Sequence, residues 1–312
     1  MPGMRVVHLE SGRHLYGGAA QVRYLIEGLA AKGVDNLLIC PQGSDIATAA
    51  AALPCQVLPI AMAGDLDVGV LLRCWRLLRR LQPDLLHVHS RRGADSYGGW
   101  AARAAGVPAV VSRRVDNLEP KWLAQLRYRP YAAVIGISAA IRELLEARMG
   151  VSSERLHRVL SAVDTRRFRP QQEDLALKQN LAQELGFSAD RRLIGIVAQF
   201  IERKGHADLF AALNRLGQEH DDVAVLCFGQ GPLEQALRQR AKSMGLQGRV
   251  YFAGFRGDME RLLPLLTLVV HPAHAEGLGV ALLEAQACGI PVIGARAGGI
   301  PEVIADGETG LV

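Results

Sequence analysis

Long apolar runs, an apolar segment at the start of the sequence and the cysteine spacing of a disulfide framework are all missing from these 312 residues. The longest apolar candidate, LLPLLTLVV at 262–270, falls far short of the roughly 20 residues that a transmembrane helix needs. The N-terminal segment MPGMRVVHLE has no apolar leader core, so we expect no signal peptide. The cysteines are scattered, without the spacing of a disulfide framework or a zinc site: Cys40, Cys55, Cys74, Cys227 and Cys288. We therefore expect a cytoplasmic protein.

The composition is that of an ordinary globular protein, with 49% apolar and 21% charged residues. A chain of this length suits two domains of about 150 residues each. Charge is distributed unevenly: residues 1–166 carry 21 Lys and Arg against 14 Asp and Glu, a net +7, and the remainder carries 15 against 17, a net −2. No nucleic-acid-binding module accompanies the basic half, so we expect no nucleic-acid partner.

Short apolar strands alternate with helical patterns from Arg5 onward, which predicts βα units around a parallel sheet. The stretch 164–190 is polar and lacks a strand pattern, and the alternation restarts at LIGIVAQF (193–200). We predict two Rossmann-like domains, at 1–166 and 167–312. Ligands in such folds bind beyond the carboxyl ends of the strands, and two facing sheets would form one cleft between the domains.

Two carboxylates, Glu276 and Glu284, stand eight positions apart in the segment HAEGLGVALLEAQACGIPVI. If the whole interval were helical, they would lie about 12 Å apart and roughly 80° apart around the helix axis. Carboxylates that cooperate on one glycosidic bond lie within about 5 to 10 Å, so a hydrolase pair is a poor explanation. The spacing favours an extended ligand held at two points.

Glycine pairs occur where strands meet helices, as in YGGAAQ, FGQGPL, HAEGLG and AGGIPE. Glycine there lets the backbone approach a phosphate, although a tight turn explains a single pair as well. No intact G-x-G-x-x-G follows the first strand, which argues against a simple NAD enzyme. Arg203 and Lys204 follow the strand at 193–200 directly and could neutralise a diphosphate, the alternative being a solvated basic turn.

The sequence resembles the retaining GT-B glycosyltransferases of family 4 in three motifs taken together. These are E-x7-E after HPAHAEG, R-K-G-H at the first turn of the same domain, and G-G after the first strand. The resemblance extends over nearly the whole chain, including PDLLHVHS, AVDTRRFRP and GGIPEVIADGETGLV. It implies a GT-B fold, an acceptor domain followed by a nucleotide-sugar donor domain, and no need for a metal ion. In that family the chain continues further, so we expect this one to be truncated at its C-terminus.

The resemblance also implies roles for individual residues. Glu276 would accept hydrogen bonds from the donor sugar, Glu284 would bind the ribose, and Lys204 would hold the diphosphate. The residues expected to bind the donor are Gly17, Gly18, Arg203, Lys204, Phe255, Arg256, Glu276, Gly277, Leu278, Gly279 and Glu284. The base would lie against the backbone near Phe255 and Arg256.

Two departures from the family pattern concern charge at the reaction centre. An Arg usually stands five residues before the phosphate-binding Lys, and this chain has Gln199 there. Many members have a His in the loop after the fifth strand, and this chain reads VSRRVDN instead. We expect Asp116 to orient the sugar or the acceptor hydroxyl and Arg113 or Arg114 to bind an acidic acceptor. The alternative is a solvated ion-pair cluster of the three residues.

No metal site is evident from ligand spacing. Asp65 and Asp67 form a D-x-D pattern, but they precede a helical pattern at 68–81 and are interpreted as helix caps. The i, i+2 spacing of His87 and His89 is interpreted as turning the two rings to opposite faces of a strand, which would keep them from binding one ion. We expect His89 to contribute to the acceptor site, and we expect metal-independent chemistry.

Basic and apolar side chains share two segments of the first domain. Arg73, Arg76, Arg79 and Arg80 lie on one side of the helical pattern at 71–81, and KWLAQLRYRPY at 121–131 mixes aromatics with cations. Such segments could lie on an anionic membrane surface or receive an acidic, lipid-linked acceptor, the alternative being an ordinary solvated face.

The leading hypothesis is therefore a hexosyltransferase that moves a sugar from a nucleotide-diphosphate donor to an envelope lipid or lipopolysaccharide-type acceptor, with retention. It would act in the cytoplasm, at the inner face of the membrane if the basic segments bind lipid. Two alternatives remain open: a nucleotide-sugar-binding protein with little or no turnover, and a GT-B-type UDP-GlcNAc epimerase.

Overall fold

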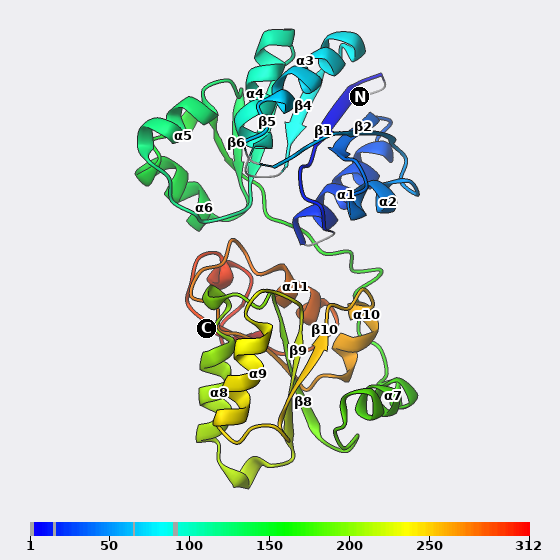
Figure 1. The fold of residues 1–312 in the computed structure, drawn as a ribbon, viewed down its shortest axis with the longest axis vertical. Helices are drawn as coiled ribbons and strands as arrows, with labels where there is room; N and C mark the ends of the chain where they lie inside the picture. Colours follow the sequence, from blue (N-terminus) through cyan, green and yellow to red (C-terminus); the bar gives the residue numbers. More distant parts are fainter. Residues whose placement is uncertain (1–2, 15–16, 65, 90–92) are drawn as a thin grey trace. The chain divides into compact units, whose positions relative to one another are not determined.

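The computed structural model describes residues 3–14, 17–64, 66–89 and 93–312. The chain forms two compact units, Met1–Ala162 and Val163–Val312, and each unit contains one sheet flanked by helices (Figure 1). Asp65, one of the two predicted caps, lies outside the described residues. Within the described part of the chain, no helix combines the length and apolarity that crossing a bilayer requires.

The first unit is built on a parallel sheet whose strand order is β3-β2-β1-β4-β5-β6-β7. Its strands are β1 (Arg5–Leu9), β2 (Asp35–Pro41), β3 (Gln56–Ile60), β4 (Leu85–Val88), β5 (Ala109–Arg113), β6 (Ala133–Gly136) and β7 (Leu156–Arg158). Its helices are α1 (Gly17–Ala30), α2 (Asp45–Ala50), α3 (Gly69–Leu81), α4 (Ala94–Ala105), α5 (Lys121–Tyr128) and α6 (Ala139–Glu143). The strand order reverses between β1 and β4, where open α/β sheets bind ligands beyond the carboxyl ends of their strands.

The second unit repeats this plan with the order β10-β9-β8-β11-β12-β13. Its strands are β8 (Arg192–Val197), β9 (Val223–Phe228), β10 (Val250–Gly254), β11 (Leu268–His271), β12 (Val292–Gly294) and β13 (Gly310–Leu311). Its helices are α7 (Leu175–Leu185), α8 (His206–Arg215), α9 (Glu234–Ser243), α10 (Met259–Leu262) and α11 (Val280–Ala287), and a short 3-10 helix, η3 (Glu202–Lys204), follows β8. Here the strand order reverses between β8 and β11.

The interior strand β9 shows that the sheet of the second unit is covered on both faces. Its sequence VAVLCF is buried at every position. Alternate residues enter different clusters, because side chains point to opposite faces of a strand in turn. Leu226 and Phe228 join one apolar cluster, and Val225 and Cys227 join the other. A strand that is apolar throughout, rather than alternating, is typical of a parallel sheet between two layers of helices.

The predicted fold class, two Rossmann-like α/β units with parallel sheets, is confirmed. Ser138 caps α6 as its position suggests, since its hydroxyl accepts a hydrogen bond from the backbone N–H of Ile141 at 3.1 Å. The cap residue of α3 is Val68, which makes no side-chain cap bond, so Asp67 is not the cap residue itself. Its carboxylate accepts from the backbone N–H groups of Ala63 and of Gly69, the first residue of α3, and pairs with Arg73.

Candidate functional site

An ion pair between Lys204 and Glu276 lies at the carboxyl edge of the second sheet. Lys204 ends η3, directly after β8, and Glu276 lies in the loop between β11 and α11. Because β8 and β11 are neighbours, their following loops meet, and the ammonium group of Lys204 donates to Glu276 Oε2. Lys204 is only 8% exposed, which is unusual for a lysine and requires a charged partner. Sequence reasoning named both residues, and the fold places them in contact.

Glu276 is also bonded to His271, which the sequence reasoning missed. His271 ends β11, and its Nε2 lies 2.8 Å from Glu276 Oε2, while Oε1 accepts from the Gly277 N–H at 3.1 Å. Burial by itself would raise the pKa of Glu276, but the hydrogen bond from His271 and the charge of Lys204 outweigh it and lower the pKa to about 2. Glu276 is therefore a permanent carboxylate. The only signal in the sequence was a histidine at a strand end, five residues before the glutamate.

Two glycines bring the loops of this site close together. Gly205, the glycine of R-K-G, has φ +70°, and a Cβ there would lie 1.9 Å from the carbonyl oxygen of Pro272. Gly298, in the segment AGGIPE, has φ +52°, and a Cβ there would lie 1.9 Å from the carbonyl oxygen of Glu276. Both positions require glycine, since backbone occupies the space of a side chain. These glycines thus set the positions of Lys204 and Glu276, which explains two of the motifs.

Arg203 is hydrogen-bonded to the loop that carries Glu276. Its Nη1 donates to the carbonyl oxygen of Ala275 at 2.8 Å, and its own carbonyl accepts from the His274 N–H at 2.8 Å. The guanidinium group is thus bonded to the segment that carries Glu276. Its role as a diphosphate ligand in place of the Arg missing at Gln199 stays a prediction.

Glu284 lies on α11, which begins only at Val280, so Glu276 is outside the helix. Burial raises the pKa of Glu284 to about 7, partly opposed by the charge of Arg167 and reinforced by that of Glu260. Between the two acids, Gly277, Leu278 and Gly279 lead into the helix, and all three residues are buried. The two carboxylates are thus in different electrostatic environments, one ionised at all ordinary pH values and one titrating near neutrality.

Phe255 and Arg256, the residues predicted near the base, directly follow β10, the edge strand of the second sheet. Phe255 is 51% exposed. Arg256 donates to Glu184 at 3.1 Å and to Asp258 at 3.3 Å, so its guanidinium group is bonded within the unit. The loops after β10, β8 and β11 all leave the same edge of the sheet.

In the first unit, Gly17 and Gly18 begin α1, after β1. A Cβ on Gly18 would lie 3.7 Å from Arg114 Cδ, and Arg114 donates to Ser161 Oγ at 3.2 Å. Burial lowers the pKa of Arg114 to about 10, although Glu10 opposes the shift, so the guanidinium stays charged at neutral pH. A predicted donor-binding glycine and a predicted acceptor-binding arginine thus lie side by side.

The prediction that Arg113 binds the acceptor needs correction. Arg113 is 5% exposed, and its guanidinium group donates to the carbonyl oxygens of Val115 and Asn117 at 2.9 and 2.6 Å. It also lies beside two acids, the buried Asp95 and the partly buried Glu119. Its donors therefore hold the loop after β5 and α5 together, which leaves Arg114 as the acceptor candidate.

Asp116 lies in the same loop and is partly exposed. In the described part of the chain no ion pair joins it to either arginine, so the alternative of a three-residue ion-pair cluster is wrong. Its proposed catalytic role stays a prediction.

The interpretation of His87 and His89 is also wrong. Residues two apart in a strand share a face, because the side chains alternate with period two. The rings of His87 and His89 lie 3.9 Å apart between centroids, and His89 is 1% exposed and pairs with His8. His89 is thus less accessible to an acceptor than its position at the strand end suggested.

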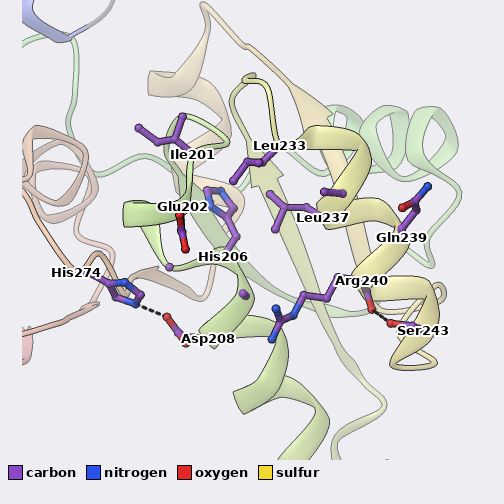
Figure 2. A pocket seen from close by; sticks show the side chains of 13 residues that line it. Ile201, Glu202, His206, Asp208, Leu233, Leu237, Gln239, Arg240, Ser243 and His274 are labelled. Atoms are coloured by element: carbon purple, nitrogen blue, oxygen red, sulfur yellow. Dashed lines mark hydrogen bonds and ion pairs between the residues drawn. The ribbon is translucent and has the colours of Figure 1, made fainter.

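A pocket of about 730 Å³ lies beside α8 and α9 of the second unit (Figure 2). Its wall includes Glu202, His206, Asp208 and His274. The last two are hydrogen-bonded, with His274 Nε2 at 2.6 Å from Asp208 Oδ2. Lys204, Glu276 and Glu284 do not line it. The pocket therefore borders the segments that follow β8 and β11 without containing the charged site.

The chain has two Rossmann-like units, a lysine–glutamate pair at the carboxyl edge of the second sheet, and a further acid on the next helix. These features define a nucleotide-sugar-dependent transferase of the GT-B class. Two family profiles match the chain, "Glycosyltransferase Family 4" over residues 16–167 and "Glycosyl transferases group 1" over residues 178–312. The chain belongs to this family of retaining glycosyltransferases.

Curated relatives include the alpha-D-kanosaminyltransferase of Streptomyces kanamyceticus, 26% identical over 93% of this chain and 84% of that protein. Another is the UDP-Gal:alpha-D-GlcNAc-diphosphoundecaprenol alpha-1,3-galactosyltransferase of Escherichia coli, 25% identical over 71% of this chain and 60% of that protein. The match spans only about half the length of some other relatives, such as EpsD of Bacillus subtilis at 49%.

Solved structures share the fold. Anabaena Alr3699/HepE in complex with UDP and glucose matches 99% of this chain and 85% of that chain, with a TM-score of 0.84 and 20% identity. WaaG, a glycosyltransferase involved in lipopolysaccharide biosynthesis, matches 99% of this chain and 85% of that chain, with a TM-score of 0.73 and 18% identity. At these identities the likeness establishes the fold alone.

Proposed function

We propose that the protein transfers a hexose from a nucleotide-diphosphate sugar to a hydroxyl acceptor with retention, and that the second unit binds the donor. The observation that carries the proposal is the buried pair of Lys204 and Glu276, with Glu284 on the following helix. A UDP-type donor is supported by HepE, which binds UDP and glucose, and by the galactosyltransferase relative, whose name specifies UDP-Gal.

The ion pair suggests how the donor enters. Without a ligand, the Lys204 ammonium satisfies Glu276. When a nucleotide sugar binds, its sugar hydroxyls can donate hydrogen bonds to the Glu276 carboxylate, and its diphosphate can pair with the Lys204 ammonium. Each charge then exchanges one partner for another and is never left unpaired while buried. In the reaction, Lys204 stabilises the charge that develops on the leaving diphosphate, one oxygen of which takes the proton of the acceptor hydroxyl.

Glu284 and the base-proximal residues complete the proposed donor site. The Glu284 carboxylate accepts hydrogen bonds from the ribose hydroxyls, and the backbone near Phe255 and Arg256 contacts the base. The N–H groups of Gly277 to Gly279, which lead into α11, face the sugar and phosphate. None of these roles requires a metal ion.

We propose that the first unit receives the acceptor, with Arg114 binding an acidic group and Asp116 orienting the sugar or the acceptor hydroxyl. A lipid-linked or lipopolysaccharide-type acceptor is supported by the diphosphoundecaprenol galactosyltransferase and by WaaG. The surface of this unit suits a lipid interface at the inner face of the cytoplasmic membrane. Trp122 and Leu126, at i, i+4 spacing on α5, are 68% and 48% exposed, and Leu118, just before the helix, is 60% exposed.

The test is Glu276→Gln with UDP-, GDP- and ADP-sugars as candidate donors. The amide keeps the size of the side chain but removes the charge that pairs with Lys204. We expect transfer to fall by at least ~10²-fold, the low end for the loss of one electrostatic contact in the transition state. Glu202→Gln, at an exposed position two residues before Lys204, is the control and should retain activity. A Glu276→Gln variant that transfers sugar as fast as the wild type would contradict the proposal.

One observation favours a second candidate, a nucleotide-sugar-binding protein with little turnover. Gln199 occupies the position of a family arginine, and Arg203 is bonded to Ala275. A protein of this kind would bind UDP in calorimetry and yet form no product with any donor. Gln199→Arg decides between the two: a large gain in turnover supports the weak-enzyme alternative, and an unchanged high turnover contradicts it.

A further inference from the structure

Three histidines meet where the strand order of the first sheet reverses. His8 of β1 is the register partner of His87 of β4, and the His89 N–H donates to the carbonyl oxygen of Leu9 at 2.9 Å, which extends the pairing by one residue. Register partners and residues two apart share a face, so all three rings project to the same side of the sheet. One ring nitrogen from each histidine lies within 4.8 Å of the other two.

These imidazoles are neutral at physiological pH. His8 and His89 are 0% and 1% exposed, and His87 is partly buried. Burial lowers the pKa of His8 to about 4 and that of His87 to about 3, and it places the pKa of His89 well below its usual value. Each neutral ring keeps one unprotonated nitrogen, which is the form that binds metal ions.

The orientation of His8 is set by its neighbours. Asn36 Nδ2 donates to the carbonyl oxygen of Val34 at 2.8 Å, so Asn36 Oδ1 is the atom that faces His8 Nε2 at 3.0 Å. His8 Nε2 therefore carries the proton, and the Nδ1 lone pair of His8 points at His89. A ring nitrogen held in this way by an outer hydrogen bond is typical of histidines that bind metals. His87 is anchored similarly, with Nε2 at 2.8 Å from Ser112 Oγ.

One nitrogen of the cluster has no partner. His8 Nδ1 and His89 Nε2 are 2.9 Å apart, and because His8 Nδ1 accepts, His89 Nε2 must donate. His89 Nδ1 is then a buried lone pair without a hydrogen-bond donor in the described part of the chain. Unsatisfied buried polar atoms of this kind are rare. This one points away from His8, and it can take up the proton that an ion bound at His89 Nε2 would displace.

We infer that His8, His87 and His89 form a binding site for a divalent transition-metal ion of the zinc class. Nitrogen ligands at 2.0–2.1 Å from a tetrahedral zinc ion are about 3.3 Å apart, so the 2.9 Å between His8 and His89 needs only a small widening. The ion would replace the shared proton, which moves to His89 Nδ1 so that both rings stay neutral. Three protein ligands leave the fourth position for water.

Charge near the cluster selects the kind of ion. Arg114 contributes to the lowered pKa of both His87 and His89, so its positive charge also opposes a cation. Ions that bind through charge and oxygen ligands, such as Mg²⁺ and Ca²⁺, are disfavoured. Zn²⁺, Ni²⁺ and Cu²⁺ bind imidazole strongly enough to tolerate the guanidinium. The inference does not depend on the proposed transfer reaction, since the cluster lies entirely in the first unit.

The test is zinc binding by the full chain after it has been stripped with a chelator. Equilibrium dialysis followed by metal analysis should give about one Zn²⁺ per chain, and X-ray absorption should give imidazole nitrogens at about 2.0–2.1 Å. His87→Gln should weaken binding at least ~10-fold, the low end of the effect of losing even an outer-shell partner. His157→Gln, at an exposed position in β7, is the matched control and should bind zinc as the wild type does.

His87 is the best position for the variant because it is only partly buried and glutamine can still bond to Ser112. Thermal unfolding in the presence of chelator checks that the variant folds. His89→Gln is the second variant and should also lose zinc. The inference is overturned if the wild type binds no zinc saturably, if both variants bind it as tightly as His157→Gln, or if the absorption spectrum lacks imidazole.

Discussion

Gly205 lies against the backbone of Pro272 so closely that a Cβ would come within 1.9 Å of the Pro272 carbonyl oxygen. Gly205 follows Lys204, and Pro272 follows β11, which leads into the Glu276 loop. This contact between two loops that are distant in the sequence sets the distance between ammonium and carboxylate.

Gly205→Ala should therefore impair both folding and donor binding. The left-handed backbone alone costs about 1–2 kcal/mol, and the overlap with Pro272 adds to it by forcing the loops apart. We expect a loss of at least about 2 kcal/mol in urea unfolding and weaker UDP-sugar binding in calorimetry. Gly245→Ala is the matched control, because Gly245 has φ +72° but open space around its Cα. Equal effects of the two substitutions would show that the contact is unimportant.

Donor binding should depend on pH through Glu284. Its pKa of about 7 means that the carboxylate, which we propose accepts hydrogen bonds from the ribose hydroxyls, becomes protonated as the pH falls through neutrality. UDP-sugar affinity should decrease from pH 8 to 6, whereas Glu284→Gln should show little change over that range. Glu276, with a pKa of about 2, contributes nothing to this profile. A pH dependence that persists in Glu284→Gln would assign it to another group.

The same shift has a consequence for stability. The carboxyl group of Glu284 titrates near 4.5 when unfolded and near 7 when folded, so the folded state binds more protons between these values. The free energy of unfolding should therefore fall as the pH rises from about 4.5 to 7, and this contribution should be absent in Glu284→Gln. Urea unfolding of both proteins across that range measures it.

Asp116→Asn should separate chemistry from donor binding. If Asp116 orients the sugar or the acceptor hydroxyl, turnover should fall by at least ~10²-fold while UDP-sugar affinity stays the same. Asp84→Asn is the control, since Asp84 lies just before β4, at the opposite end of the strands, and bonds to the Arg5 N–H. Unchanged turnover, or an equal loss of donor affinity, would remove Asp116 from the catalytic residues.

Membrane association should depend on Trp122. Burying a third of the roughly 200 Å² of a tryptophan contributes about 1.7 kcal/mol, so Trp122→Ser should reduce binding to anionic vesicles roughly 15- to 20-fold in sedimentation. Added salt should weaken the remaining binding, because the basic surface contributes through charge. Leu175→Ser is the control, with a similarly exposed apolar residue in the second unit. A wild type that does not sediment with vesicles would contradict the membrane proposal.

Much of the fold and of the proposed donor site followed from the sequence alone. Alternating apolar strands and helical patterns predict parallel sheets, and the residues that follow parallel strands must emerge at the same edge of the sheet. That rule is enough to bring Lys204, after β8, and Glu276, after β11, to one edge. It needs no knowledge of side-chain contacts, since it depends on strand direction only.

The tertiary structure decided what lies beside these residues. Arg113 turns inward because Asp95, from α4, supplies a buried negative charge beside it, and no local pattern places that helix there. His8 meets His87 and His89 only because β1 and β4, distant in the sequence, are neighbours in one register. Pairing and burial depend on which strands become neighbours and on how their loops pack, and short-range spacing carries no information about either.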